Sequence, residues 1–460
     1  PPPAGGPLLP PPGEPMPTDL SSSDAQRFCS QLVKLHGLVR WPSLNGKLAR
    51  LAGYYTEAKR WHVILPSGEH LRLRSANMRT LTLREDAKCG AVFVFGGYNG
   101  SRYLNNCACW SSSWPMWNIL PGMKQGRCDA AVASVGPLVF VLGGSLGKKT
   151  KAPPGSPRRQ PREEAREAEA LNTMECFDAQ AMSWLPMPRM LHSRRCAAVA
   201  VIGEEIFICG GLSASEMYPA ARYLSSMDSF STRTTHWRGL PSMLHGRASA
   251  SLVRVSGALY ACGGSGMDRM PLNTMERFSL IAEMWDRIFI HEGMCLSFAL
   301  VVLDECLYLC GGETCDGRTV RTVLRFSHRT LKWESLPPML QPRSLSVAVV
   351  TTAGDICVCG GCYRAQKANA ASALRQVSSV EVFRVASLSW SYVQSMGTPR
   401  SFACSTTIGG YLYVFGGIGP DGPTSSAERF NLAKETWHEL PRLPAPVVGA
   451  GSAAVEVLSS

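Results

Sequence analysis

Arginine recurs at a fixed place relative to pairs of adjacent glycines. Five arginines stand about sixteen residues before a Gly-Gly pair: Arg127, Arg194, Arg247, Arg343 and Arg400. A guanidinium group binds carboxylate or phosphate through paired, charge-assisted hydrogen bonds. If the five side chains gather around one axis, they predict a positively charged mouth that attracts an acidic partner segment.

A second reading of these arginines is structural. An acid stands two residues before an aromatic residue in five repeats: Glu175, Asp228, Glu276, Glu381 and Glu428. We expect each of these acids to bond to the backbone or to an arginine in its own repeat. The arginines could therefore hold the repeats together instead of binding a partner.

We expect most of the seventeen cysteines to pack in the core and not to bind a metal or react as thiols. Many lie in apolar runs such as "IFICGG" and "LYLCGG", where a free cysteine acts as a small hydrophobic residue. The cluster of Cys357, Cys359 and Cys362 lacks the paired C-x-x-C spacing of a zinc site. Cys315 and Cys362 are expected in loops, where a redox-sensing thiol is an open alternative. This usage favours a reducing setting, which is the cytoplasm or, as the alternative, the nucleus.

Composition and motifs narrow the classes of function. No run of 18 or more apolar residues is present, so we expect no membrane span. The net charge of +12 suits an acidic partner, but the charge is not gathered into a patch with interleaved aromatic residues, which argues against nucleic acid. No P-loop, G-x-G-x-x-G, G-x-S-x-G or H-E-x-x-H motif occurs, so we expect no enzyme and no cofactor. The oligomeric state is left open.

The elements that must position these residues are repeats. Seven apolar runs each end in a Gly pair, at residues 96–97, 143–144, 210–211, 263–264, 311–312, 360–361 and 416–417. An aromatic residue follows each pair, and a tryptophan follows seven residues later: Trp110/Trp117, Phe177/Trp184, Phe230/Trp237, Phe278/Trp285, Phe326/Trp333, Phe383/Trp390 and Phe430/Trp437. Spacings of 47 to 67 residues indicate a repeat architecture.

The Gly pair, the acid before the aromatic residue and the tryptophan resemble the kelch β-propeller family over residues 83–460. The resemblance implies an all-β fold in which each repeat is a twisted four-stranded sheet covered by its neighbours. The first Gly pair lacks a preceding apolar strand, while "VVGAGSAAVEVL" at 447–458 is a strand without a Gly pair. We therefore predict seven blades, with the C-terminal strand completing the first.

The N-terminal part is different. Residues 1–22 are rich in Pro, Gly and Ser, which predicts a disordered segment. Residues 23–36 have weak helical periodicity, and residues 37–82 alternate in short runs broken by turns. We predict a small β-barrel with a short preceding helix over 23–82, which resembles a small Src-homology barrel and implies an interaction or spacer module. The insertion at 146–172 is predicted to be disordered, and that at 363–376 to be a flexible loop.

The kelch resemblance also implies a function and a site. In kelch substrate adaptors the arginines and the residues after the Gly pairs line the partner-binding face. Carried over, the latter are Tyr98, Asn99, Arg102, Ser145, Ser213, Ser265, Glu313, Tyr363 and Arg364. We expect a non-enzymatic scaffold or substrate-recognition module that binds an acidic protein segment, including a ubiquitin-ligase substrate adaptor.

Two alternatives remain open. One is an actin- or cytoskeleton-binding kelch protein, which would use the basic surface. The other is a copper radical oxidase of the kelch fold, which needs two histidines, two tyrosines and a cysteine. His192, His245 and His291 fall in connecting loops, but no tyrosine accompanies them at comparable spacing, so we assign no metal ligand.

Overall fold

The computed structural model describes residues 13–18, 20–26, 28–81, 90–147, 168–215, 218–267, 270–290, 296–364 and 374–456. Within them the chain is all-β, apart from the helix α1 (Ser22–Gln26) and the short 3-10 helices Pro42–Leu44 and Ser75–Asn77. None of the helices in the described ranges is long and apolar enough to cross a membrane.

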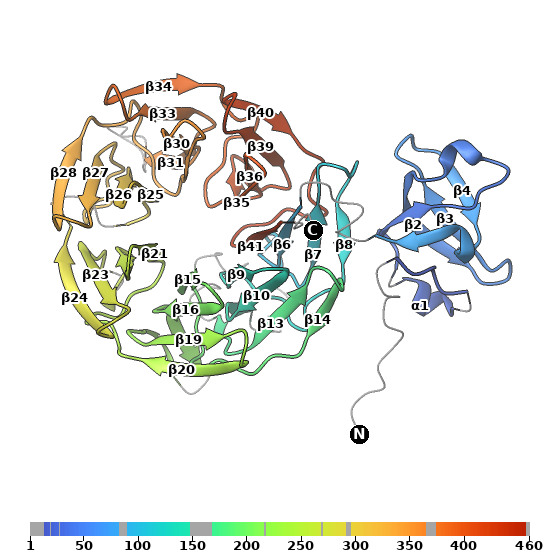
Figure 1. Cartoon of the computed structure of the whole chain (residues 1–460), viewed down its shortest axis with the longest axis horizontal. Helices are drawn as coiled ribbons and strands as arrows, with labels where there is room; N and C mark the ends of the chain where they lie inside the picture. The colour runs from blue at the N-terminus through green and yellow to red at the C-terminus, as the bar shows by residue number, and fades with distance from the viewer. Residues whose placement is uncertain are drawn as a thin grey trace, which may run out of the picture.

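Seven four-stranded antiparallel sheets follow one another along the described chain and are arranged as a ring (Figure 1). We call them blades 1 to 7. Blade 1 contains β41 (Gly451–Val455), β6 (Ala91–Phe95), β7 (Cys107–Trp110) and β8 (Asn118–Leu120). Blade 2 contains β9 (Ala131–Val135), β10 (Leu138–Leu142), β13 (Met174–Asp178) and β14 (Ser183–Leu185).

The other five blades repeat this pattern. Blade 3 contains β15 (Ala198–Ile202), β16 (Glu205–Cys209), β19 (Met227–Ser231) and β20 (His236–Leu240). Blade 4 contains β21 (Ser251–Val255), β22 (Ala258–Cys262), β23 (Thr274–Ser279) and β24 (Met284–Phe289). Blade 5 contains β25 (Ala299–Leu303), β26 (Cys306–Cys310), β27 (Val323–Ser327) and β28 (Lys332–Leu336).

Blade 6 contains β29 (Val347–Val350), β30 (Ile356–Cys359), β33 (Val380–Arg384) and β34 (Ser389–Val393). Blade 7 contains β35 (Cys404–Ile408), β36 (Tyr411–Phe415), β39 (Ala427–Asn431) and β40 (Thr436–Glu439). In every blade the first strand lies toward the centre of the ring and the fourth toward its rim (Figure 1).

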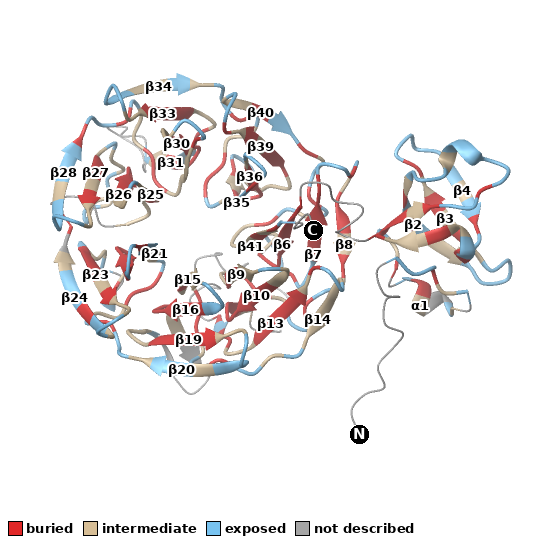
Figure 2. Ribbon diagram, viewed as in Figure 1, coloured by how far each residue is buried: buried red, intermediate tan, exposed pale blue. Residues whose placement is uncertain are grey.

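Burial follows position within a blade. The second strands are almost wholly buried, as in β22 and β6, because neighbouring blades cover both of their faces. Fourth strands such as β20 and β28 are largely exposed and are drawn in blue at the rim of Figure 2, whereas the fourth strand β8 is mostly buried. Apolar runs in the second strand and mixed sequences in the fourth are therefore what this packing requires.

Four of the seven recurring tryptophans form a hydrogen bond to the preceding blade, whereas the indole N–H groups of Trp237, Trp333 and Trp437 are buried without a partner among the described residues. Trp184 of blade 2 donates its indole N–H to the carbonyl of Pro121, in the loop that leaves blade 1, at 2.8 Å. Trp117, Trp285 and Trp390 make the same bond to the preceding blade, at 2.7, 2.8 and 2.8 Å. Trp184, Trp285 and Trp390 also pack on the aromatic residue of their own blade, as for Phe278 and Trp285 with centroids 5.1 Å apart, whereas Trp117 packs on Phe415 of blade 7.

The Gly pair is required where the second strand ends against two connecting loops. Gly311 and Gly312 have φ values of 66° and 105°. A Cβ on Gly311 would lie 2.2 Å from the carbonyl oxygen of Arg343, and one on Gly312 would lie 2.5 Å from that of Leu296. Both the backbone conformation and the space therefore exclude a side chain at these positions.

Blade 1 is built from both ends of the propeller sequence. Strand β41 pairs antiparallel with β6, from Gly451 opposite Phe95 to Val455 opposite Ala91. Val448 forms a further bridge with Tyr98 just before this strand. The last described strand of the chain thus lies beside the first strand of the repeat region (Figure 1).

A five-stranded sheet precedes the propeller. Its order is β4 (His70–Leu73), β3 (Arg60–Ile64), β2 (Leu48–Tyr55), β1 (Leu32–Leu35) and β5 (Met78–Thr80). The helical pattern expected over residues 23–36 is wrong beyond Gln26, because residues 32–35 pair with β2 and β5. Trp61 and Phe28 lie in the core of this unit.

The prediction of disorder over residues 1–22 is wrong for residues 13–18, while residues 1–12 lie outside the described ranges. Pro15 forms a bridge with Arg79, and Met16 is buried. The Pro17 carbonyl accepts hydrogen bonds from the Ser75 hydroxyl and the Trp61 indole. This stretch is ordered because it covers the apolar core of the five-stranded sheet.

The N-terminal unit packs on blade 1. Leu32 and Leu81 belong to one apolar cluster with Phe93, Phe95 and Trp114 of that blade. The Leu32 N–H donates to the Asn118 side-chain oxygen at 3.0 Å, and Asn118 begins the outer strand β8. In Figure 1 the unit lies beside β8, outside the ring.

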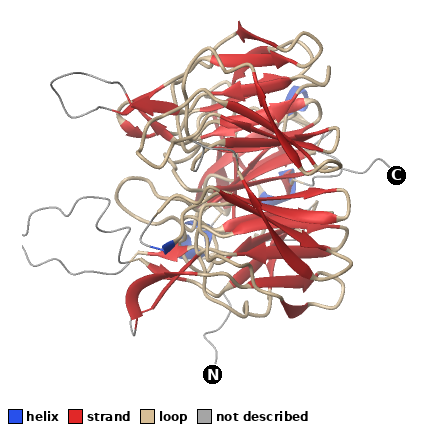
Figure 3. Ribbon diagram, turned by 90° about the vertical axis from the view of Figure 1, so that its left-hand side faces the viewer, coloured by secondary structure: helices blue, strands red, loops and turns tan. Residues whose placement is uncertain are grey.

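Four small two-stranded sheets extend the loops that follow Gly pairs. They are β11 (Ser145–Leu146) with β12 (Glu169–Ala170), β17 (Leu212–Ser215) with β18 (Tyr218–Tyr223), β31 (Cys362–Arg364) with β32 (Leu374–Gln376), and β37 (Ile418–Gly419) with β38 (Gly422–Pro423). Disorder over the whole of 146–172 is therefore wrong at both ends of that insertion, and residues 148–167 lie outside the described ranges. Figure 3 views the ring edge-on, with loops along both of its faces.

Candidate protein-binding face

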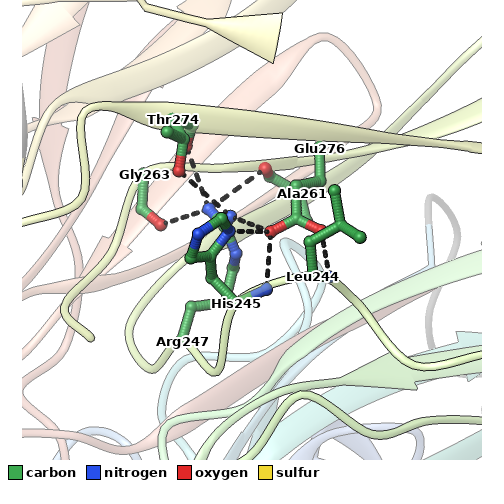
Figure 4. A network of polar contacts seen from close by, with 7 residues as sticks. All are labelled: Leu244, His245, Arg247, Ala261, Gly263, Thr274 and Glu276. Atoms are coloured by element: carbon green, nitrogen blue, oxygen red, sulfur yellow. Dashed lines mark hydrogen bonds and ion pairs between the residues drawn. The ribbon is translucent and has the colours of Figure 1, made fainter. Parts of the chain in front are cut away.

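The five recurring arginines lie inside their blades, as Figure 4 shows for Arg247. One terminal nitrogen of Arg247 donates to the carbonyls of Gly263 and Thr274, at 2.9 and 3.0 Å. The other reaches the Glu276 carboxylate at 2.6 Å. Glu276 also accepts from the backbone N–H groups of Leu244 and His245, at 2.6 and 3.1 Å. The pair thus ties the end of the second strand, the third strand and the incoming loop together.

The same arrangement occurs in four other blades. The arginines are at most 1% exposed, and their acidic partners are buried as well. The ion pairs are Arg127–Glu175, Arg194–Asp228, Arg343–Glu381 and Arg400–Glu428. Burial lowers the pKa of Arg194, and the adjacent Asp228 opposes that shift. The prediction that these five arginines line a positively charged mouth is therefore wrong, because their charge is already neutralised inside the blades.

The sequence contains a signal for this pairing. The arginine and the acid occur in the same five repeats. In blade 5 the two positions are Cys295 and Leu324, and in blade 1 they are Val447 and Ala108. Because a buried charge needs a partner, loss of both residues together indicates a pair within the blade.

Blade 3 has a weaker version of the network. Asp228 is one methylene shorter than the glutamates, and its Oδ1 atom is buried without a hydrogen-bond partner. The His192 ring contacts the other oxygen at 3.0 Å, and His245 contacts Glu276 at 3.3 Å. The two histidines lie in different blades and are each bound to a buried acid, while His291 is outside the described ranges. Among the described residues no group of three metal-ligating side chains is present.

Antiparallel pairing places two kinds of loop at one end of every blade. Loops that follow the Gly pairs and loops that enter the next blade lie together on what we call the loop face. The short turns between first and second strands, and between third and fourth strands, lie on the opposite face, which we call the turn face.

The predicted residues after the Gly pairs all lie on the loop face, but differ in exposure. Ser145 is buried, and its hydroxyl donates to the Cys128 carbonyl at 3.2 Å. Arg102 and Arg364 are exposed. The remainder are half-buried: Tyr98, Asn99, Ser213, Ser265, Glu313 and Tyr363.

Three of the half-buried residues have internal partners. The Asn99 side-chain oxygen accepts from the N–H groups of Ser101 and Arg102, which shapes a turn. The Ser213 hydroxyl contacts that of Ser193 at 3.0 Å, and Glu313 accepts from the Ser344 hydroxyl at 3.0 Å. Cys362, expected in a loop, is wholly buried in β31, whereas Cys315 is exposed.

Arg195 is a candidate site residue that is not identified by the search for arginines about sixteen residues before a Gly pair. It is 7% exposed, and the structure gives its guanidinium no hydrogen bond or ion pair to any described residue, unlike the five paired arginines. Its charge lowers the pKa of Asp129, opposing the rise that burial causes, so the two groups are neighbours. Burial also raises the pKa of nearby Tyr103 to about 12. A guanidinium at the surface that makes no hydrogen bond to a described residue is available to an anionic ligand.

The two faces of the propeller differ in charge. Outside the five buried pairs, described loop-face residues include ten cations and five acids: Arg102, Lys124, Arg189, Arg195, Arg222, Arg318, Arg321, Arg364, Arg375 and Arg442, with Asp129, Glu169, Glu313, Asp316 and Asp421. The described turns of the turn face have three cations and six acids: Arg233, Arg329 and Lys434, with Glu204, Glu283, Asp304, Glu305, Asp355 and Glu435. The loop face is thus the one that attracts an acidic ligand.

Two family models match the chain. The KLHDC2/KLHL20/DRC7 Kelch-repeats domain matches residues 297–458, and the Kelch motif matches residues 193–244. Kelch-like protein terF of Aspergillus terreus is 26% identical over 353 residues, which are 73% of this chain and 61% of the relative. Kelch domain-containing protein 8B of Homo sapiens is 31% identical over 151 residues, which are 32% of this chain and 38% of the relative. The chain thus spans less than two thirds of either relative.

Among solved structures, the "Structure of YjhT" superimposes with a TM-score of 0.53 over 70% of this chain and 99% of that chain. Its sequence identity is 14%, so this likeness concerns the fold alone. The β-propeller architecture, the in-phase repeats and the two family models agree. Residues 193–244 and 297–458 of this chain are kelch repeats, within a propeller of the same repeating architecture.

Proposed function

We propose that this chain is a non-enzymatic interaction module whose loop face binds an acidic segment of a partner protein. The observation that carries the proposal is the charge difference between the faces, with ten cations to five acids on the loop face and three to six on the turn face. The kelch-repeat relatives support a protein-interaction role.

The physical basis has a long-range and a short-range part. Exposed cations such as Arg102, Arg321, Arg364 and Arg375 steer an acidic partner, but each adds little affinity because water and salt screen it. Arg195 is buried, so its pairing with a carboxylate would be screened far less. We expect binding to weaken as salt rises, mostly through a slower association rate.

Charge reversal on each face tests this proposal. The loop-face variant is Arg321→Glu/Arg364→Glu/Arg375→Glu, and its matched control is Arg233→Glu/Lys332→Glu/Lys434→Glu at or next to the turn face. All six residues are exposed, and both variants change the net charge equally. Tagged proteins would be used to capture partners from cell lysate and compared by mass spectrometry.

The proposal predicts that the loop-face variant loses the acidic proteins captured by the wild type while the turn-face variant keeps them. If both variants lose the acidic proteins equally, binding depends only on the net charge of the chain, and the proposal of a specific binding face is contradicted. Retention of all partners by the loop-face variant would place binding elsewhere.

Recruitment of substrates to a ubiquitin ligase is the finer form of this proposal that kelch adaptors suggest. It predicts that ligase subunits are captured together with the acidic partner and are retained by the loop-face variant, because they dock outside the loop face. Capture of the partner without any ligase subunit would restrict the role to a scaffold.

A further inference from the structure

A ring of left-handed residues surrounds the centre of the loop face. Each loop that enters a blade contains one residue with φ between 51° and 62°, two positions after the place of the recurring arginine. Around the ring these residues are Gly449, Asp129, Cys196, Ser249, Ser297, Leu345 and Phe402. We call them the ring residues.

Backbone hydrogen bonds link the ring residues from blade to blade. The N–H of Asp129 donates to the carbonyl of Gly449 at 2.9 Å, and the N–H of Cys196 donates to that of Asp129 at 3.0 Å. Equivalent bonds join Ser249 to Cys196, Leu345 to Ser297 and Phe402 to Leu345, at 2.9, 2.9 and 3.4 Å. These bonds fix equivalent positions of neighbouring blades side by side at the centre of the face.

The ring has a polar arc and an apolar arc. Asp129, Cys196, Ser249 and Ser297 follow one another, and Leu345 and Phe402 come next. Phe402 is 49% exposed, and its neighbour Leu345 is half-buried. Half-exposed aromatic and aliphatic side chains within a charged face have the character of a binding anchor.

Arg195 adds a charged position to the polar arc. It directly precedes the ring residue Cys196, and its guanidinium makes no hydrogen bond or ion pair to any residue that the structure describes. The ring thus offers an aromatic anchor in one arc and, beside the other, a guanidinium that has no hydrogen bond to a described residue and has Asp129 as its acidic neighbour.

We propose that the ring is the specificity site of the loop face, and that it takes an extended peptide segment with a large apolar side chain and a carboxylate. The apolar side chain packs on Phe402 and Leu345, and the carboxylate pairs with Arg195. The excess of cations on the surrounding loops favours an acidic segment as the occupant over a basic one. This inference rests on the proposed function and names its central contacts.

The left-handed conformation makes a clean test possible. A glycine at Phe402 keeps the conformation without steric strain, so Phe402→Gly should fold while the anchor is lost. Leu388→Gly is its matched control. Leu388 is also left-handed, with φ 50°, and is 48% exposed, but it lies in the turn between β33 and β34 on the turn face. For the cation, Arg195→Gln is compared with Arg102→Gln, which removes an exposed charge from the same face.

The probe is a random peptide library selected on the full chain, followed by fluorescence anisotropy with the enriched peptides. We expect enriched sequences to combine an acidic residue with a large apolar one. Phe402→Gly and Arg195→Gln should each weaken binding about tenfold or more, as for a central anchor. Leu388→Gly should bind as the wild type, Arg102→Gln should lose less than Arg195→Gln, and all four variants should keep melting temperatures within a few degrees of the wild type.

The possible failures are distinguishable. Enriched peptides that bind Phe402→Gly and Arg195→Gln like the wild type would overturn the ring site but leave the interaction role intact. Failure of the wild type to enrich any peptide would overturn both. Self-association of the wild type that Phe402→Gly abolishes would make a second copy of this chain the occupant, and would overturn the peptide proposal.

Discussion

At the residue scale, the neighbours Arg194 and Arg195 have opposite roles. Arg194 is paired with Asp228 at 2.6 Å and bonds the Gly210 carbonyl at 3.0 Å, so it holds blade 3 together. Arg195 has no bonded partner among the described residues and lies at the ring on the loop face. The repeat spacing singles out the first of them, although the second is the one left available to a ligand.

Alanine substitutions separate these roles. Arg194→Ala leaves the buried Asp228 carboxylate with only the His192 ring as a partner, which is expected to lower the free energy of unfolding by about 3 kcal/mol. Arg195→Ala removes a buried charge that has no bonded partner, so the change should be under about 1 kcal/mol. Urea denaturation of the two variants measures both values. A larger loss for Arg195→Ala than for Arg194→Ala would show that the assignment is reversed.

The short acid of blade 3 gives a second prediction at this scale. Asp228→Glu should stabilise the protein by about 1 kcal/mol, because the longer side chain can satisfy the loop N–H groups that the glutamates bind in other blades. Glu276→Asp is the reverse change and should destabilise blade 4 by about 1 to 3 kcal/mol. Thermal unfolding of both variants would check the pair, and a stabilising Glu276→Asp would refute the explanation.

At the scale of elements, the second strand and its Gly pair form the part of the fold that the sequence predicts best. The Gly pairs end the second strands, and the tryptophans lie on the fourth strands or directly before β8. Both positions are predictable because local steric crowding requires the glycines and packing between blades requires the tryptophans. The N-terminal stretch at residues 13–18 was mispredicted, since its order comes from covering Trp61 and the rest of a distant core. Composition alone contains no information about such a contact.

The Gly pair also gives the sharpest prediction about an element. Gly312→Ala would place a Cβ 2.5 Å from the Leu296 carbonyl oxygen, so we expect a loss of more than about 3 kcal/mol. Gly317→Ala, in the loop that follows, has φ 78° but no atom within 4 Å of the added Cβ. It should cost only the backbone strain of about 1 to 2 kcal/mol. Similar losses in the two variants would mean that crowding at the strand end does not matter.

At the scale of the whole molecule, blade 1 joins the chain's ends and supports the N-terminal unit. It contains β41 beside β6, lacks the buried Arg–acid pair, and packs on Leu32 and Leu81. A chain ending at Val448 removes β41, which exposes the edge of β6 and its buried side chains. We expect it to lose several kcal/mol of stability, since burial of apolar area is worth about 25 cal/mol per Å². A chain ending at Glu456 retains every described residue and should melt like the full chain; equal melting of the Val448 and Glu456 truncations would exclude a closing role for β41.

The site was less predictable than the fold for a physical reason. Leu345 and Phe402 both stand two positions after a recurring arginine, in "PRSL" and "PRSF", but nothing in these motifs indicates exposure at the centre of a face. The ring that groups them with Arg195 is made of backbone conformation and hydrogen bonds between blades. The buried pairing of the arginines, in contrast, could have been read from the joint loss of arginine and acid in the same two repeats.

Hydrogen exchange of the full chain, with and without its most strongly enriched peptide, tests the central claim most directly. Exchange slows where a ligand buries or rigidifies the backbone. We predict slower exchange in the loops around residues 98–106, 128–130, 194–197 and 400–403, and no change in the turns at 280–283, 328–331 and 385–388. Protection confined to those turns would place the binding surface on the turn face and contradict the account.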